Sequence, residues 1–180
     1  MPSQTAEAAN GQGFQLYVMR HGIAAPRGAR EFPDDYKRPL TDDGRKTMKA
    51  IAKGLARLDL RVDSVITSPL VRAAETAEIV AKGLDPAVPV EASDELRPGG
   101  SLQALMAHLG KYADRRSVLI VGHEPDLSDA VAKLVGAGRQ TNFRFKKGGC
   151  CRIDFDDFPP HPPARLVWWI TPAVMKKIGK

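Results

Sequence analysis

Two arginines and two histidines follow apolar stretches at three separate points of the chain. They are Arg20 and His21 after the first stretch, Arg72 after the second and His123 after the third. Arginine presents a planar fork of donors that fits phosphate oxygens. A neutral imidazole can attack phosphorus, and phosphoryl transfer depends mainly on positioning and charge stabilisation. These residue types therefore predict a phosphoryl-transfer site that works without a metal ion or any other cofactor.

The sequence around these residues alternates between two hydrophobic patterns. Short apolar runs predict buried strands, and apolar residues three and four positions apart predict amphipathic helices. The predicted strands cover residues 14–19, 62–67, 88–91, 117–121, 151–155 and 166–170. The predicted helices cover residues 41–58, 68–83, 101–109 and 127–135. Thr41 is the predicted N-cap of the first helix, and Ser68 and Pro69 are the predicted N-cap and first residue of the second.

Apolar strands that alternate with helices predict an α/β fold, here a three-layer α/β/α sandwich around a largely parallel sheet. In open parallel sheets, ligands bind at the carboxyl ends of the strands. Since the three polar segments all follow strand ends, we expect them to face one crevice. Helix N-termini at the same edge add N–H donors and the positive ends of their dipoles.

The composition sets the broad class of the protein. The 180 residues are 43% hydrophobic and 27% charged, as in soluble globular proteins. No apolar run approaches the roughly 20 residues of a membrane span, and the start of the chain does not resemble a signal peptide. Residues 1–13 are a predicted loose tail, and residues 14–180 are a predicted single domain.

Charge and cysteine content bear on partners and compartment. The net charge of +6 favours an anionic partner, but the charge is dispersed and only 6% of residues are aromatic, so neither nucleic acid nor a membrane is the expected partner. Cys150 and Cys151 are adjacent and are predicted to be buried strand residues. Two such cysteines fit a protein of the reducing cytoplasm.

A predicted loop over residues 22–39 contains four basic residues, which are Arg27, Arg30, Lys37 and Arg38. These side chains are either simply solvated or form a positive rim that steers an acidic partner domain. Arg38 is also a candidate for binding the substrate.

The three polar segments resemble a known family. Residues 20–22 (Arg-His-Gly), 68–77 and 121–125 are similar in order and spacing to the signatures of the histidine phosphatase (phosphoglycerate mutase-like) superfamily. The small size of the chain and residues 38–41, 95–100 and 169–172 narrow the resemblance to the SixA-type phosphohistidine phosphatase branch, which acts in signal transduction.

The resemblance implies a role for each candidate residue. His21 would be the nucleophile and would pass through a phosphohistidine intermediate. Arg20, Arg72 and His123 would bind and neutralise the phosphoryl oxygens. The resemblance also implies that no metal is needed and that the substrate is a phosphorylated protein, such as a histidine-phosphotransfer or kinase domain.

One position departs from the family pattern. Many members carry a proton-donating glutamate in a Leu-x-Glu stretch, and Leu96-Arg97-Pro98 stands at the comparable place here. An alkoxide leaving group needs an acid, whereas an imidazole, with a pKa of roughly 6.5, takes a proton from solvent. The missing donor therefore favours phosphohistidine in a phosphorelay or phosphotransfer protein as the substrate.

Two further interpretations stay open. Glu124 directly follows His123 and could supply the acid, which would fit a small-molecule phosphomonoesterase or nucleotide phosphatase. Glu95 is a second candidate for the acid. Glu124 could instead only compensate the dipole of the helix that begins there. The chain could also be a non-catalytic phosphate-binding module.

Overall fold

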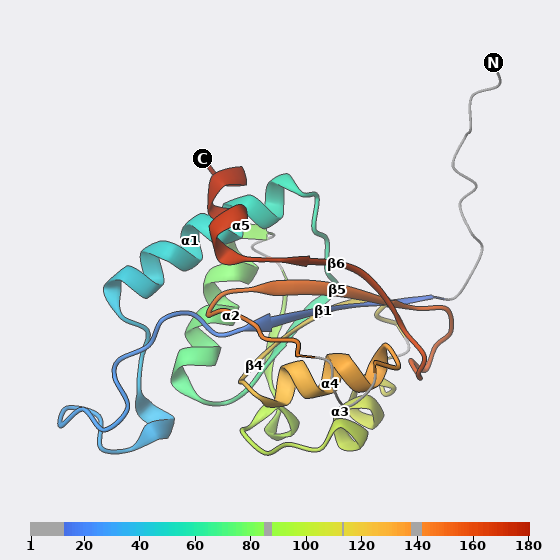
Figure 1. Ribbon diagram of the computed structural model, residues 1–180, viewed down its shortest axis with the longest axis horizontal. Coiled ribbons are helices and arrows are strands. Elements are labelled where there is room, and N and C mark those ends of the chain that lie inside the picture. Colours follow the sequence, from blue (N-terminus) through green and yellow to red (C-terminus); the bar gives the residue numbers. More distant parts are fainter. Residues whose placement is uncertain (1–12, 85–87, 113, 138–141) are drawn as a thin grey trace.

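The computed structural model describes residues 13–84, 88–112, 114–137 and 142–180, and its strands form one central sheet (Figure 1). The strands are β1 (Phe14–Arg20), β2 (Ser64–Thr67), β3 (Val90–Ala92), β4 (Ser117–Gly122), β5 (Cys150–Phe155) and β6 (Arg165–Ile170). Their order in the sheet is β3-β2-β4-β1-β5-β6. The first four in this order are parallel, whereas β5 runs antiparallel to both β1 and β6. The predicted α/β fold with a largely parallel sheet is confirmed.

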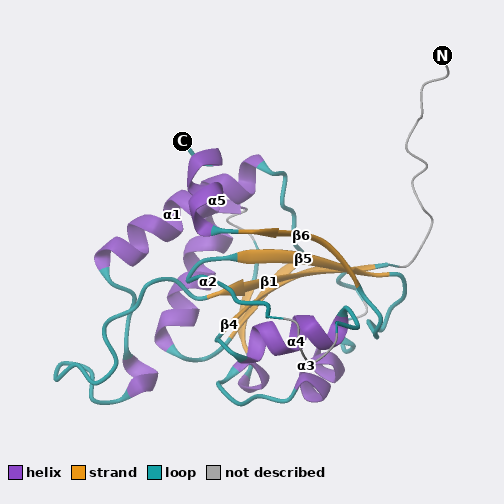
Figure 2. Cartoon of the chain, viewed as in Figure 1, coloured by secondary structure: helices purple, strands orange, loops and turns teal. Residues whose placement is uncertain are grey.

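Helices cover both faces of this sheet (Figure 2). One face carries α1 (Asp42–Arg57), α2 (Val71–Leu84) and α5 (Pro172–Ile178), and the other carries α3 (Leu102–Leu109) and α4 (Asp126–Leu134). Two short 3-10 turns, η1 (Asp35–Lys37) and η2 (Asp94–Leu96), lie in the connections. The predicted three-layer arrangement is therefore confirmed as well.

The alternation of side chains along β1 explains why both faces need a covering layer. Tyr17 and Met19 pack toward α1 and α2, while Leu16 and Val18 pack toward α3 and α4. Successive residues of a strand point to opposite faces, so an uninterrupted apolar strand is stable only between two layers. The packing on both faces holds the end of β1, where Arg20 begins the polar segment, in a fixed place.

Cys150 and Cys151 lie in β5 and are both buried, as predicted. They face opposite layers of the core, and burial raises the pKa of both thiols. Neither is poised to react, because the thiolate is the reactive form of cysteine.

Two details of the helices differ from the prediction. The second helix begins at Val71 rather than at Pro69 with Ser68 as its N-cap, and the hydroxyl of Ser68 contacts the histidine of another segment, as described below. The sequence analysis also missed α5, although Thr171 and Pro172 are typical of a helix start. That helix has only seven residues and packs on α1, so little local periodicity reveals it.

The predicted tail lies outside the described residues except for Gly13. Within the described part of the chain, none of the helices has the length and apolar character required to span a bilayer.

Candidate functional site

The three polar segments meet at the end of the sheet where the parallel strands have their carboxyl ends. The backbone N–H of His21 donates to the carbonyl of Gly122 over 3.1 Å, and that of Ser68 donates to the carbonyl of Val121 over 3.0 Å. The strand ends β1, β4 and β2 therefore continue side by side into their loops. The predicted convergence of these segments is confirmed.

His21 is buried, with 7% of its surface exposed, and its ring is held in one orientation. Its Nδ1 lies 2.7 Å from the carbonyl oxygen of Gly22. A carbonyl can only accept, so Nδ1 bears the proton and Nε2 keeps a free lone pair. Burial is the main reason that the pKa of His21 is lowered to about 3. The nearby His123, Arg72 and Arg20 act in the same direction, and the hydrogen bond to Gly22 opposes them. The imidazole is therefore neutral near pH 7 and has a nucleophilic nitrogen.

Gly22 ties this histidine to α2. Its N–H donates to Oγ1 of Thr76 over 3.0 Å, and the Thr76 hydroxyl donates to the carbonyl of Arg72 over 2.7 Å. A Cβ atom on Gly22 would lie 2.7 Å from Cγ of Met48, so only glycine fits between α1 and the site. Sequence reasoning did not single out Thr76, whose role depends on the contact between two segments.

His123 lies beside His21, with 5.1 Å between the ring centroids, and it is also buried. Its Nε2 is 2.9 Å from Oγ of Ser68, which also accepts the N–H of Leu70. Nε2 is the only acceptor within reach of the Ser68 hydroxyl proton among the described residues, so the hydroxyl donates to Nε2 and the N–H of the neutral ring lies on Nδ1. Burial and, to a smaller extent, the charge of Arg72 lower the pKa of His123 to about 4.

Arg20 is held by a segment that sequence reasoning missed. Its NH1 donates to the carbonyl of Phe145 over 2.7 Å. The ring of Phe145 stacks on Trp169, with centroids 3.9 Å apart, which fixes that carbonyl. Gly149 accepts the N–H of Arg20, and the N–H of Gly148 donates back to the Arg20 carbonyl. The phenylalanine gave no signal in the sequence beyond its apolar character.

Arg72 is almost fully buried, and a single residue occupies one end of its guanidinium group. Its NH1 donates to the backbone carbonyl of Asp35 over 2.7 Å, and its NH2 contacts Oδ2 of the same aspartate at 3.0 Å. Asp35 also accepts a bond from Nε of Arg38 over 2.8 Å. Arg38 is itself buried, and its NH1 donates to the carbonyl of Ala25. Arg38 is thus part of the site's framework and not a freely solvated loop residue.

Glu124 is placed beside the site, but its carboxylate oxygens are occupied. The Ser128 hydroxyl lies 2.7 and 2.8 Å from its two oxygens, and the N–H of Phe145 donates to Oε1 over 3.1 Å. Glu124 therefore links the start of α4 to the segment that holds Arg20. Glu95 lines a cavity of about 100 Å³ that His123 also lines.

Three donors in this cluster have no partner. Nε of Arg20, Nε of Arg72 and Nδ1 of His123 are buried and make no hydrogen bond within the described part of the chain. Each unpaired buried donor costs free energy unless a ligand satisfies it. All three belong to residues that surround the neutral His21. The arrangement fits a tetrahedral oxyanion beside a nucleophilic nitrogen.

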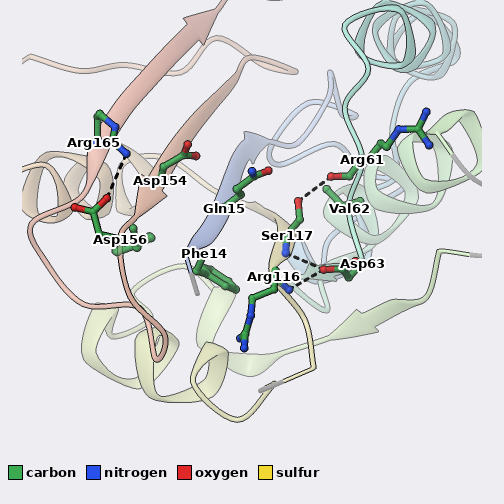
Figure 3. A pocket seen from close by; sticks show the side chains of 12 residues that line it. Phe14, Gln15, Arg61, Val62, Asp63, Arg116, Ser117, Asp154, Asp156 and Arg165 are labelled. Atoms are coloured by element: carbon green, nitrogen blue, oxygen red, sulfur yellow. Dashed lines mark hydrogen bonds and ion pairs between the residues drawn. The ribbon is translucent and has the colours of Figure 1, made fainter. Parts of the chain in front are cut away.

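Another hollow lies at the opposite end of the sheet (Figure 3). None of its described lining residues has a buried side-chain donor without a hydrogen-bond partner. It measures about 500 Å³ and is lined in part by Asp63, Asp156 and Arg165. Asp63 accepts the N–H groups of Arg116 and Ser117 over 2.7 and 2.8 Å, and Asp156 pairs with Arg165 at 3.3 Å. Asp63 and Asp156 are thus engaged in contacts within the protein. Among the described residues, no group of three or more histidines, cysteines or carboxylates is placed to hold a metal ion.

The two buried histidines predict a pH-dependent stability. Their folded-state pKa values of about 3 and about 4 lie below the unfolded value of roughly 6.5, so the unfolded chain binds more protons in this range. Their stabilisation is fully present above the unfolded value and is lost as the pH falls toward the folded values. We expect each histidine to lower the free energy of unfolding by about 2 kcal/mol between pH 8 and pH 5.

Urea unfolding of the wild type, His21→Gln and His123→Gln at both pH values measures this effect. Each glutamine variant should lose less stability on acidification than the wild type. His161→Gln is the control, because His161 is exposed. An equal loss in all four proteins would contradict the expectation.

Comparisons with known proteins identify relatives of this chain. Residues 16–98 match the family model of the histidine phosphatase superfamily (branch 1). The chain is 38% identical over 139 residues to an uncharacterised protein of Picosynechococcus sp. strain PCC 7002, covering 76% of this chain and 82% of that protein. It is 33% identical over 123 residues to the phosphohistidine phosphatase SixA of Escherichia coli strain K12, covering 67% and 74% of the two chains.

The fold is also similar to that of a solved relative. The structure of the protein histidine phosphatase SixA complexed with tungstate superposes with a TM-score of 0.76 at 28% sequence identity, and covers 89% of this chain and 98% of that one. Sequence similarity, fold and the arrangement of Arg20, His21, Arg72 and His123 all point to one family. The chain therefore belongs to the histidine phosphatase superfamily and is a relative of SixA.

Proposed function

We propose that this protein is a metal-independent phosphatase that removes the phosphoryl group from phosphohistidine in a phosphorelay or phosphotransfer protein. The observation that carries the proposal is the set of three unpaired buried donors around a neutral histidine. The relative SixA of Escherichia coli bears the name phosphohistidine phosphatase, and a solved SixA binds tungstate, a tetrahedral oxyanion. Both facts support the same chemistry for this chain.

In the first step, Nε2 of His21 attacks phosphorus. A new N–P bond forms as the N–P bond to the substrate imidazole breaks, and the departing imidazole carries a proton that its other ring nitrogen took from solvent. Nε of Arg20, Nε of Arg72 and Nδ1 of His123 donate to the phosphoryl oxygens. Such preorganised donors in a buried site stabilise the charge of the transition state.

In the second step, water attacks the phosphorus of the phosphorylated His21. The N–P bond breaks and its electron pair returns to Nε2. One proton of the attacking water stays on the new P–O oxygen and the other passes to solvent, so the product leaves as hydrogen phosphate. The bond between Nδ1 and Gly22 holds the same ring orientation through both steps. The enzyme then returns to its starting state.

Two candidate acid positions, Pro98 and Glu124, support phosphohistidine over an alkyl phosphate. Pro98 stands where the family pattern has a glutamate and has no proton to give. Both oxygens of Glu124 lie within bonding distance of the Ser128 hydroxyl, and one also accepts the N–H of Phe145. A departing alkoxide would need a proton from such a group, whereas a protonated phosphoimidazole leaves as neutral imidazole.

The surface beside Arg20 supports a protein substrate. A hollow of about 660 Å³ is lined by Arg20, Glu124 and residues 142–146, so the site adjoins open space. Arg144 and Lys146 are exposed in this lining and bring positive charge to it. A phosphohistidine on an acidic protein domain could reach the site from this side.

A side-by-side turnover assay tests the proposal. A phosphohistidine-bearing protein and a panel of alkyl, sugar and nucleotide phosphates are offered in the presence of chelator. We expect a clear preference for the phosphohistidine protein. Alkyl-phosphate rates that are equal or higher would contradict the substrate assignment, and the absence of turnover on every compound would favour a phosphate-binding module.

Glu124→Gln separates the proposal from a phosphomonoesterase that uses Glu124 as its acid. Glutamine keeps an oxygen that can accept the N–H of Phe145 but has no carboxyl proton. We expect phosphohistidine turnover to stay within about threefold of the wild type, since the departing imidazole needs no protein acid. Loss of alkyl-phosphate hydrolysis alone in this variant would identify Glu124 as an acid for that reaction.

A further inference from the structure

Asp35 contacts one of the proposed phosphate-binding arginines more extensively than any other described residue does. We propose that Asp35 is a positioning residue, which holds the terminal nitrogens of Arg72 so that Nε–H faces the phosphoryl group. This inference rests on the proposed function, because it assigns Arg72 to the phosphoryl oxygens. Neither the basic residues of the loop nor the family signatures pointed to this aspartate.

The guanidinium group of Arg72 has one edge that is bound within the protein and one that is free. The backbone carbonyl and the carboxylate of Asp35 take NH1 and NH2, at 2.7 and 3.0 Å. Guanidinium donors lie in one plane with fixed directions, so this grip also fixes the direction of Nε–H. Nε is buried and has no partner among the described residues. The edge that Asp35 leaves free is therefore the one available to a ligand.

Asp35 is itself held in place. Its Oδ1 accepts Nε of the buried Arg38 over 2.8 Å, and NH1 of Arg38 donates to the carbonyl of Ala25. Partial burial alone would raise the pKa of Asp35, but the hydrogen bond from Arg38 and the charge of Arg72 lower it below its usual value. The side chain is thus ionised at neutral pH and contacts three arginines, because Nε of the exposed Arg27 also lies 3.3 Å from Oδ1.

The same carboxylate could instead act as an internal anion that competes with the substrate for Arg72. Two observations favour positioning. The backbone carbonyl of Asp35 also accepts a hydrogen bond from Arg72, so a phosphoryl group that displaced only the Asp35 side chain would not release Arg72. In addition, the Nε edge stays free while Asp35 is bound, so the ligand and the aspartate use different donors of one guanidinium. The two roles predict opposite effects of removing the carboxylate.

Tungstate affinity and turnover of a phosphohistidine protein together test the inference in Asp35→Ala and Asp35→Asn. We expect Asp35→Ala to weaken tungstate binding and to lower kcat/KM by about tenfold to a hundredfold, as misplacement of a catalytic group does. Asp35→Asn should lie in between, because its amide oxygen still accepts one bond. Asp34→Ala is the matched control, because Asp34 caps the adjacent Tyr36 N–H and makes no contact with Arg72.

A double-mutant cycle shows whether Asp35 acts through Arg72. In an Arg72→Ala background, Asp35→Ala should cause little further loss of tungstate affinity. Tighter tungstate binding in Asp35→Ala would overturn the inference in favour of an internal competitor. Unchanged binding, or equal losses in Asp34→Ala and Asp35→Ala, would overturn it as well. A wild-type protein that binds no tungstate would refute the proposed function itself, and this inference with it.

Discussion

Replacing His21 with alanine is expected to lower turnover by a factor on the order of 10⁴ or more. No other described side chain has the same combination of a fixed tautomer, a free Nε2 lone pair and a pKa lowered to about 3 by burial. Without that nitrogen, no N–P bond to the enzyme can form. His123 cannot replace it, since the free position of the neutral His123 ring bears a proton.

Trapping of the phosphoenzyme measures this directly. Brief incubation with a radiolabelled phosphohistidine protein and denaturation in alkali should leave an acid-labile label on the wild type and none on His21→Ala. His161→Ala is the matched control, because it removes an exposed histidine outside the site. A labelled His21→Ala protein, or full turnover without label, would refute the covalent mechanism.

Replacing Arg72 with lysine is expected to reduce kcat/KM by a factor on the order of 10² to 10³. Lysine keeps the positive charge but presents a point charge in place of the planar fork. It cannot satisfy both groups of Asp35 and also present a directed N–H to the phosphoryl group. Because the interaction strengthens as charge develops, kcat should fall together with kcat/KM.

Steady-state kinetics on Arg72→Lys and Arg45→Lys separate this effect from a general loss of charge or packing. Arg45 also bridges elements, pairing with Glu75 at 2.9 Å, but it lies outside the cluster around His21. Arg45→Lys should therefore retain activity within about threefold, since surface ion pairs contribute little. A similar loss in both variants would show that Arg72 acts through the fold rather than at the phosphoryl group.

The order of strands and helices was readable from the sequence because hydrophobic periodicity is local. The apolar runs of β1 and β4 and the N-cap at Thr41 depend on residues within a few positions of one another. The start of α2 was not readable in this way. The hydroxyl of Ser68 contacts His123, 55 residues away, and the helix begins only at Val71.

The same distinction between local pattern and long-range contact applies to the candidate site. The sequence by itself determined that Arg20, His21, Arg72 and His123 lie at one edge of a parallel sheet, because each follows a strand end and the topology then brings those ends together. It also determined the family, through the order and spacing of the three segments.

Only the tertiary structure decided how these side chains are held. Asp35 reaches Arg72 across 37 residues of sequence, and the Phe145 carbonyl reaches Arg20 across 125. Such contacts depend on the paths of two loops and on a stacked aromatic pair, and no local pattern encodes them. Each contact becomes favourable only when the layers are packed and the groups are buried. For this reason Asp35 and Phe145, which orient the arginine donors, could not be predicted from the sequence.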